Sequence, residues 1–222
     1  MIEIASPPRF YRGWSRNDNY VICIYLPWHI KIGAMITKLT KLLAARQKQY
    51  IHDPARRPSA VLVPIYQEQG EYHIVFIKRT DTVKTHKGQI SYPGGGREKG
   101  DKTLRDTAIR EACEEIGLRP EDIEILGEID DEITTTSNYV VTPFVGMIPW
   151  PYKFTIEKAE VAEIITVPLS ALLDRTNLKM DIETLDGGII VDSYNYHYKG
   201  KVIWGATARI LHKLLDIIAT IN

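Results

Sequence analysis

The chain has 222 residues, 44% of them hydrophobic and 25% charged, which is typical of a folded globular protein and excludes a disordered or fibrous one. Its 28 basic and 28 acidic side chains cancel, so no overall positive field attracts nucleic acid or an anionic membrane. The two cysteines, Cys23 and Cys113, lack the clustered spacing of a zinc site or a disulfide framework, so we expect a cytoplasmic protein.

The N-terminal segment is rich in aromatic residues, arginine and proline, without a regular period. We interpret residues 1–34 as an N-terminal extension of unknown role and residues 35–222 as the regular domain. An apolar run in the extension is interrupted by Pro27 and is shorter than the about 20 apolar residues that a membrane span needs. From Met35 onward, apolar residues at helical spacing predict a helix.

The middle and C-terminal parts alternate between predicted strands and helices. The runs SAVLVPIYQ and EYHIVFIKR, joined by a glycine-containing turn, predict a β-hairpin. A loop and a glycine-rich segment lead into a helix expected from about Thr103 to Ile116 and closed by Gly117. Further strands are expected in IEILGEID, YVVTPFVGMI, EIITVPL, GIIVDSYNYHY and KVIW, with helices in SALLD and GATARILHKLLDII. This order predicts an α+β fold, a mixed β-sheet between helices in an α/β/α sandwich.

Acidic residues cluster near the end of the helix expected at 103–116. Glu111 and Glu115 are four positions apart and Glu114 precedes Glu115, so three carboxylates are expected on one side of the helix. Like charges at this end repel each other and oppose the helix dipole. A hard divalent cation such as Mg²⁺ would compensate them, because it binds carboxylate and carbonyl oxygens and bridges to phosphate.

The alternative interpretation is a solvated acidic helix end, which is the common case for three acids taken alone. The context favours the metal interpretation. Gly94, Gly95 and Gly96 precede the helix by a short loop, and glycines let backbone groups approach a metal or a diphosphate closely. Arg110, next to Glu111, can orient a carboxylate through a charge-assisted hydrogen bond.

These residues together resemble the Nudix box, in which a glycine, an acidic residue and an Arg-Glu, Glu-Glu, Gly series follow at set spacing. REACEEIGL matches the second half of the box completely. The usual spacing would start at Gly96 and place Lys102 in the acidic position, whereas a loop one residue longer starts at Gly95 and places Asp101 there. The longer loop resembles the coenzyme A pyrophosphatase branch, whose upstream signature is similar to VFIKRTDTVKTHKGQISYPGG.

The resemblance implies roles for individual residues. Glu111 and Glu115 would be the main ligands of Mg²⁺ or Mn²⁺, with Glu114 as a further ligand or water holder and the Gly95 carbonyl as a backbone ligand. Arg110 would orient Glu111. The bound metal would neutralise charge on the diphosphate and lower the pKa of the attacking water.

Residues outside the box complete the expected site. The general base would be a box glutamate or Glu160, although a lone glutamate before a strand is usually a surface residue. Arg79, Lys84 and His86 would contact the substrate phosphates, with surface solvation as the alternative for Arg79 and Lys84.

The resemblance implies hydrolysis of coenzyme A or its acyl esters to 3′,5′-ADP and 4′-phosphopantetheine. Two alternatives stay open: a Nudix hydrolase of ADP-ribose or another nucleotide, and a non-catalytic Nudix-like nucleotide-binding module. We expect a small nucleotide-derived substrate and neither nucleic acid nor a membrane as partner. A homodimer is compatible with these expectations.

Overall fold

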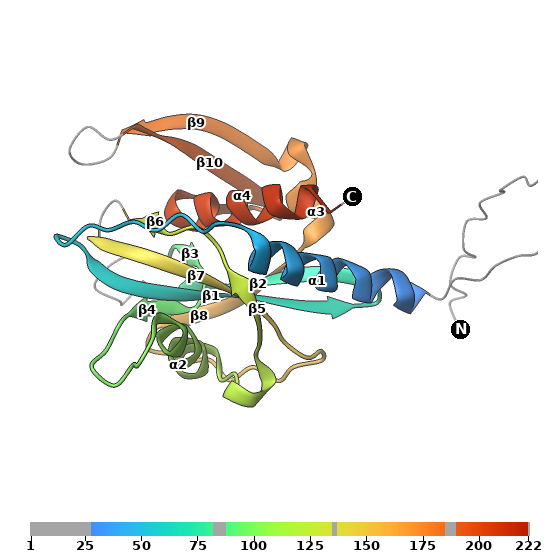
Figure 1. Cartoon of the computed structure of the whole chain (residues 1–222), viewed down its shortest axis with the longest axis horizontal. Coiled ribbons are helices and arrows are strands. Elements are labelled where there is room, and N and C mark those ends of the chain that lie inside the picture. Colours follow the sequence, from blue (N-terminus) through green and yellow to red (C-terminus); the bar gives the residue numbers. More distant parts are fainter. Residues whose placement is uncertain (1–27, 82–87, 135–136, 185–189, 222) are drawn as a thin grey trace, which may run out of the picture.

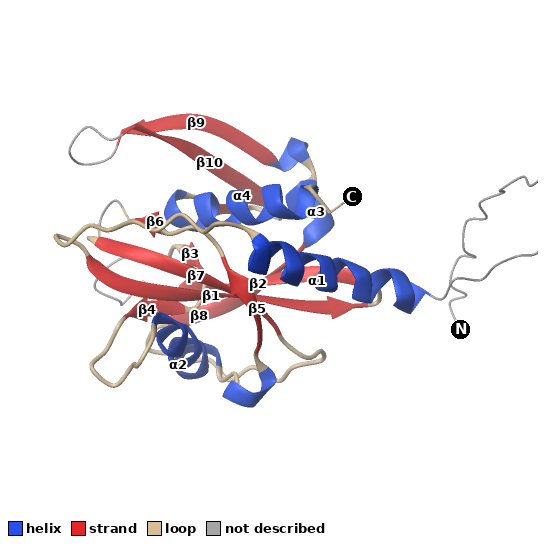
Figure 2. Cartoon of the chain, viewed as in Figure 1, coloured by secondary structure: helices blue, strands red, loops and turns tan. Residues whose placement is uncertain are grey.

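The computed structural model describes residues 28–81, 88–134, 137–184 and 190–221, with side chains described from residue 35 onward and outside 183–191. A central mixed sheet has helices on both of its faces (Figures 1 and 2). Its strands are β1 (Arg57–Glu68), β2 (Glu71–Arg79), β3 (Ile90–Ser91), β4 (Gly94–Gly96), β5 (Glu124–Glu128), β6 (Glu132–Ile133), β7 (Tyr139–Met147) and β8 (Val161–Pro168).

The strand order of the central sheet is β3-β2-β1-β7-β5, with β4 paired to β1, β6 to β7 and β8 to β2. Strands β1 and β7 run parallel, and the other pairs are antiparallel. The predicted hairpin is confirmed, because β1 and β2 pair up to Glu68 and Glu71. Gln69 and Gly70 have φ values of 49° and 88°, the left-handed backbone that a tight hairpin turn requires.

Helices cover the two faces of the sheet and bury separate apolar clusters. Helix α2 (Leu104–Ile116) lies on one face, and α1 (Trp28–Ala45) and α4 (Gly205–Ala219) lie on the other. Leu62 of β1 belongs to the cluster that contains Ala112 of α2, whereas its neighbour Val63 belongs to the cluster that contains Leu39 of α1 and Leu211 of α4. Successive side chains of β1 thus enter different cores, which confirms the predicted α/β/α sandwich.

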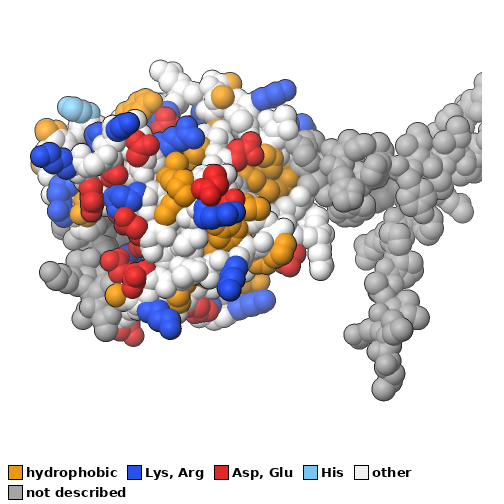
Figure 3. Space-filling model, turned by 90° about the horizontal axis from the view of Figure 1, so that it is seen from below, with side chains coloured by type: hydrophobic (Ala, Val, Ile, Leu, Met, Phe, Trp, Pro, Cys, Tyr) orange, Lys and Arg blue, Asp and Glu red, His pale blue; other side chains and the backbone are white. Residues whose placement is uncertain are grey.

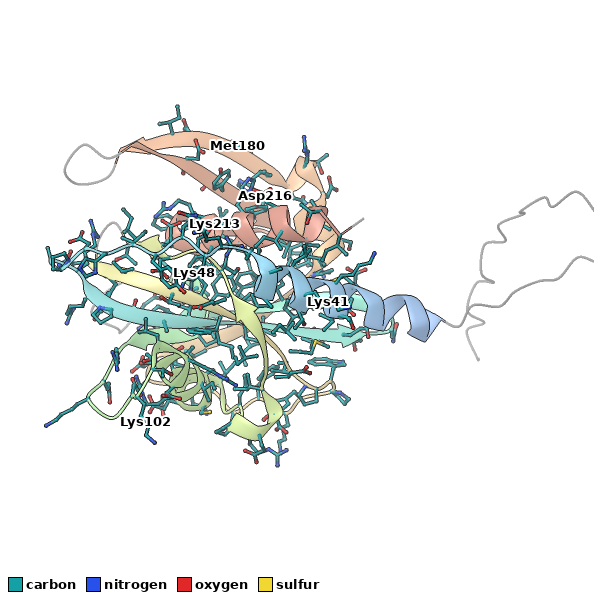
Figure 4. All side chains as sticks on the ribbon, in the orientation of Figure 1. Lys41, Lys48, Lys102, Met180, Lys213 and Asp216 are labelled. Atoms are coloured by element: carbon teal, nitrogen blue, oxygen red, sulfur yellow. The ribbon has the colours of Figure 1, made fainter. Side chains whose placement is uncertain are left out.

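A smaller antiparallel sheet lies beyond α4, on the side away from the central sheet (Figure 1). It consists of β9 (Leu178–Thr184), β10 (Ile190–Tyr198) and β11 (Lys201–Ile203), in the order β11-β10-β9. The short helix α3 (Leu169–Leu173) and the 3-10 turns Pro120–Asp122 and Arg175–Asn177 complete the described elements. Lys102, beside α2, and Lys213 and Asp216, on α4, lie on opposite sides of the central sheet (Figure 4).

The observed elements differ from the expected ones at several places, among them the short strand β6, where no strand was expected. Helix α1 begins at Trp28 rather than at Met35, so it crosses the expected boundary between extension and domain. The glycines expected in a loop form strand β4, and β9 occupies a segment for which no strand was predicted. Within the described residues, the helices are too short or too polar to cross a membrane.

Candidate active site

Helix α2 is fixed at both ends by local signals that the sequence carries. The Thr103 side chain accepts a hydrogen bond from the backbone of Asp106, whose carboxylate accepts one from the Thr103 backbone. Gly117 ends the helix with a φ of 69°. Ala108 and Ala112 are fully buried against the sheet, so the rotation of the helix is set and its acidic residues face the glycine strand β4.

The glycine strand lies directly over Glu111. Strand β4 pairs antiparallel with the start of β1, where Gly95 is opposite Ala60. A Cβ atom on Gly95 would overlap the carboxylate of Glu111, with its Cδ only 2.5 Å away. A larger residue here would displace the Glu111 carboxylate, so glycine allows the backbone and the carboxylate to lie in direct contact.

Glu115 is the most buried of the box carboxylates, with 3% of its surface exposed. Its Oε2 accepts a hydrogen bond of 2.9 Å from the Gly94 backbone N–H, and its Oε1 lies 3.2 Å from Nη1 of Arg79. Burial raises the pKa of Glu115 to about 8, against the opposing effects of Gly94 and Arg79. The negative charges of Glu111 and Glu160 raise this pKa further, so the ionised form of Glu115 needs cationic partners.

Glu111 and Glu114 both contact the guanidinium of Arg110, in different surroundings. The Glu111 side chain is 15% exposed and lies 2.9 Å from Nη1 of Arg110. Burial raises its pKa, and Arg110 acts in the opposite direction. The Glu114 side chain is 58% exposed and lies 3.0 Å from the same Nη1. The structure thus brings Glu111 and Glu115 beneath the glycines and leaves Glu114 at the surface.

Asp101 lies in the loop between strand β4 and helix α2 and pairs with Arg110 of that helix. It is 8% exposed, and its two oxygens each lie 3.1 Å from Arg110, at Nε and Nη2. Nη2 also donates to the carbonyl of Gly96, at 3.1 Å. The hydrogen-bonded guanidinium lowers the pKa of Asp101 to about 2. Lys102, the other candidate for the acidic position of the box, is exposed.

Arg79 pairs with Glu160 as well as with Glu115. Arg79 is the last residue of β2, and its Nη2 lies 3.6 Å from Oε2 of Glu160, whose side chain is 51% exposed. Arg79 thus links Glu160 to Glu115. Lys84 and His86, the other residues expected at the substrate phosphates, lie outside the described residues.

Comparison with known proteins decides the family. Residues 56–185 match the sequence model of the NUDIX domain. The chain belongs to the Nudix hydrolase family. An uncharacterised Nudix hydrolase from Photorhabdus laumondii, NudL, is 34% identical over 158 residues, which cover 71% of this chain and 83% of that protein. NudL of Pectobacterium atrosepticum is also 34% identical, over 72% of this chain and 81% of its own length.

Among solved structures, the Nudix hydrolase RenU from M. smegmatis is 18% identical, with a TM-score of 0.48 over 75% of this chain and 88% of its own. Family membership makes the protein an enzyme of the pyrophosphatase class, which hydrolyses a nucleoside diphosphate derivative.

The carboxylates of this Nudix hydrolase suit a hard divalent cation, but arginines hold them. Within the described residues, no three histidine, cysteine, aspartate or glutamate side chains stand together as a ready metal site. Arg110 holds Glu111, and Arg79 holds Glu115. The buried oxygens and the close glycine backbone fit Mg²⁺ or Mn²⁺ chemically, provided that these ion pairs rearrange.

Sequence reasoning missed the pairing of Arg79 with Glu115, because the two residues are 36 positions apart in the chain. The local signal was the place of Arg79 at the end of a strand, just before the loop that leads to the glycines. That position predicts that Arg79 lies near the site, but it does not predict that Arg79 pairs with Glu115.

Proposed function

We propose that this Nudix hydrolase cleaves the diphosphate bond of coenzyme A or an acyl-coenzyme A, giving 3′,5′-ADP and 4′-phosphopantetheine. The main support for this proposal is the pairing of Asp101 with Arg110. It favours Asp101 as the acidic residue of the box, which requires a box loop one residue longer than usual. That length resembles the coenzyme A pyrophosphatase branch. The run VFIKRTDTVKTHKGQISYPGG, similar to the upstream signature of the same branch, supports it independently.

In this proposal Mg²⁺ or Mn²⁺ is held by Glu111 and Glu115, with the Gly95 carbonyl and Glu114 as further ligands. Glu115 is buried and accepts a hydrogen bond from the Gly94 N–H, and the partly buried Glu111 lies against Gly95. This supports the set, because both carboxylates offer hard oxygen ligands beside the glycine backbone. When bound, the metal would neutralise charge on the diphosphate and make a water molecule more acidic.

The remaining residues of the site orient groups and move a proton. Arg110 fixes the Glu111 carboxylate from one side, at 2.9 Å. Glu160 is half-exposed at the edge of the cluster, where it can accept the proton of the attacking water. Arg79, with Lys84 and His86 that follow it in the chain, would donate hydrogen bonds to the substrate phosphates.

We further propose a small-molecule substrate, without nucleic acid or a membrane as partner, and a cytoplasmic location. The surface on the α2 side supports this, because acidic and basic side chains are interspersed there and form no single basic tract (Figure 3). We retain residues 35–222 as the proposed hydrolase domain, with α1 crossing its boundary. A homodimer is the oligomer to test, by light scattering in solution.

The test is a substrate panel assayed with Mg²⁺ and with Mn²⁺: coenzyme A, acetyl-coenzyme A, ADP-ribose, a dinucleoside polyphosphate and a nucleoside triphosphate. The proposal expects the highest kcat/KM for coenzyme A or its ester, with 3′,5′-ADP and 4′-phosphopantetheine identified by mass spectrometry. Equal or faster cleavage of ADP-ribose would reject the coenzyme A assignment. A Glu111→Gln variant purified in parallel controls for contaminating activity, and binding without turnover of any compound would indicate a non-catalytic module.

A further inference from the structure

Arg79 contacts two carboxylates to which the proposed function gives roles, Glu115 and Glu160. Its guanidinium reaches two carboxylates of the cluster at once, with Nη1 3.2 Å from Glu115 and Nη2 3.6 Å from Glu160. One of these carboxylates is a proposed metal ligand and the other is the proposed base. A positive charge thus already lies between the groups that a divalent cation would need.

The backbone directs Arg79 into this position. The pairing of β2 with β8 shifts register between Lys78 and Arg79, and such a bulge re-aims a side chain. The Arg79 backbone N–H donates to the Gln89 carbonyl, at 2.9 Å, and the Thr80 N–H donates to the Glu160 carbonyl, at 2.9 Å. The main chain on both sides of the guanidinium is therefore fixed, while its long side chain can change partners.

A buried donor of the Arg79 guanidinium has no hydrogen-bond acceptor within the described residues. The Arg79 side chain is 19% exposed, and its Nε is buried without a hydrogen-bond partner within the described part of the chain. A buried N–H without an acceptor is costly, so the contacts with Glu115 and Glu160 do not satisfy this side chain. A phosphate oxygen beside Nε would satisfy this donor, which the carboxylates at Nη1 and Nη2 do not.

We propose that Arg79 is an exchangeable counter-ion: it neutralises Glu115 and Glu160 in the metal-free enzyme and gives up both when a divalent cation binds. The released guanidinium then becomes a ligand of the substrate diphosphate. This inference rests on the proposed function, because it requires Glu115 to be a metal ligand. It makes Arg79 a substrate-binding residue that couples metal binding to substrate binding, and it predicts that replacing Arg79 affects the two in opposite directions.

The test measures Mn²⁺ binding by calorimetry and steady-state kinetics with coenzyme A, for the wild-type enzyme and for Arg79→Gln. Arg79→Gln removes the two ion pairs that compete with Mn²⁺, so the Kd for Mn²⁺ should fall about tenfold. This is the change expected from two partly buried ion pairs of modest strength. The same substitution should raise KM for coenzyme A, because a phosphate ligand is lost. A residue that only supports the fold around Glu115 would weaken both.

Two further variants control for charge. Arg79→Lys keeps a positive charge but cannot bridge both carboxylates, so its Mn²⁺ affinity should lie between those of the wild type and Arg79→Gln. Arg119→Gln removes a charge whose side chain is 67% exposed and which pairs with Asp122 outside the site, so its Mn²⁺ affinity should match the wild type. A melting temperature that Mn²⁺ raises more in Arg79→Gln than in the wild type would report the same linkage in a folded variant.

The outcomes separate this inference from the proposed function. A wild-type enzyme that binds no Mn²⁺ at millimolar concentration would overturn both. Normal wild-type binding with equal or weaker binding in Arg79→Gln would overturn only the exchange. Tighter binding with unchanged KM would overturn the transfer of Arg79 to the substrate.

Discussion

Asp101 and Arg110, nine residues apart in the chain, form a bidentate ion pair with both nitrogen–oxygen distances at 3.1 Å. The pair joins the loop after the glycines to helix α2, and the same guanidinium contacts Glu111. Asp101 also accepts hydrogen bonds from the Glu98 backbone and the Thr107 hydroxyl, both at 2.9 Å. The orientation of Glu111 therefore depends on a residue that need not touch the substrate.

Replacing Asp101 with asparagine should lower both stability and turnover. Arg110 would keep a polar neighbour but lose the buried charge opposite it, which should cost about 1–3 kcal/mol in the free energy of unfolding. The rotation that Arg110 then gains should reduce kcat about tenfold or more, because Glu111 is held less firmly. Urea denaturation and steady-state kinetics measure the two effects. Lys102→Gln, at the exposed neighbouring position, is the control and should change neither.

A methyl group on Gly95 should disable the site without unfolding the protein. In Gly95→Ala the Cβ would occupy the space of the Glu111 carboxylate, so either the carboxylate or the strand must move. A displacement of about 1 Å at a reacting centre can reduce kcat about a hundredfold. Gly100→Ala is the matched control, because a Cβ there meets no atom within 4 Å. Equal kcat for the two alanine variants would contradict the close contact.

The features that the sequence predicted are those with local causes. Helix α2 begins at the Thr103 cap and ends at Gly117, and both signals lie in the residues that form them. Strand β4 was expected as a loop, because three glycines have no alternating pattern and become a strand only by pairing with β1. The ion pair between Arg79 and Glu115 depends on how strand and helix pack, which no spacing in the sequence encodes.

The burial of the glutamates predicts an order among their variants. Glu111→Gln and Glu115→Gln should each lower kcat by orders of magnitude, because both carboxylates lie beneath the glycines. Glu114→Gln should cost less than about tenfold, because that side chain is 58% exposed and faces Arg110. Kinetics under saturating Mn²⁺, with circular dichroism to verify folding, measure the order. Unchanged turnover in both Glu111→Gln and Glu115→Gln would refute the proposed metal role.

Glu132 forms two ion pairs with helix α4, on the face of the sheet opposite to α2. Glu132 of β6 is 5% exposed and lies 3.0 Å from Nε of Arg209 and 2.8 Å from Nζ of Lys213, both on α4. Glu132→Gln removes the negative charge that these two cations face, which should lower the free energy of unfolding by about 3 kcal/mol. Glu163→Gln, which breaks the exposed pair with Lys201, should cost less than about 1 kcal/mol. Similar midpoints in urea for the two variants would contradict a stabilising role of the buried pair.

The pKa of Glu115 predicts how the stability of the metal-free enzyme depends on pH. Its folded value of about 8 lies above the ordinary 4.5, so the folded state retains a proton that the unfolded state releases between these values. Stability should therefore be highest below about pH 4.5 with respect to this group, and fall as the pH rises toward 8, by at most about 1.4 kcal/mol per pH unit. Asp101, with a pKa of about 2, stays ionised over this range and adds nothing to the slope.

Urea denaturation in a chelator between pH 5 and pH 8 measures this slope. Glu115→Gln should flatten it, because the titrating group is gone, and Glu114→Gln should leave it unchanged. Saturating Mn²⁺ should stabilise the wild type more at pH 8 than at pH 5, because a metal ligand must be deprotonated and the proton is already lost at the higher pH. A wild-type stability that rises with pH over this interval, in the absence of metal, would contradict the raised pKa of Glu115.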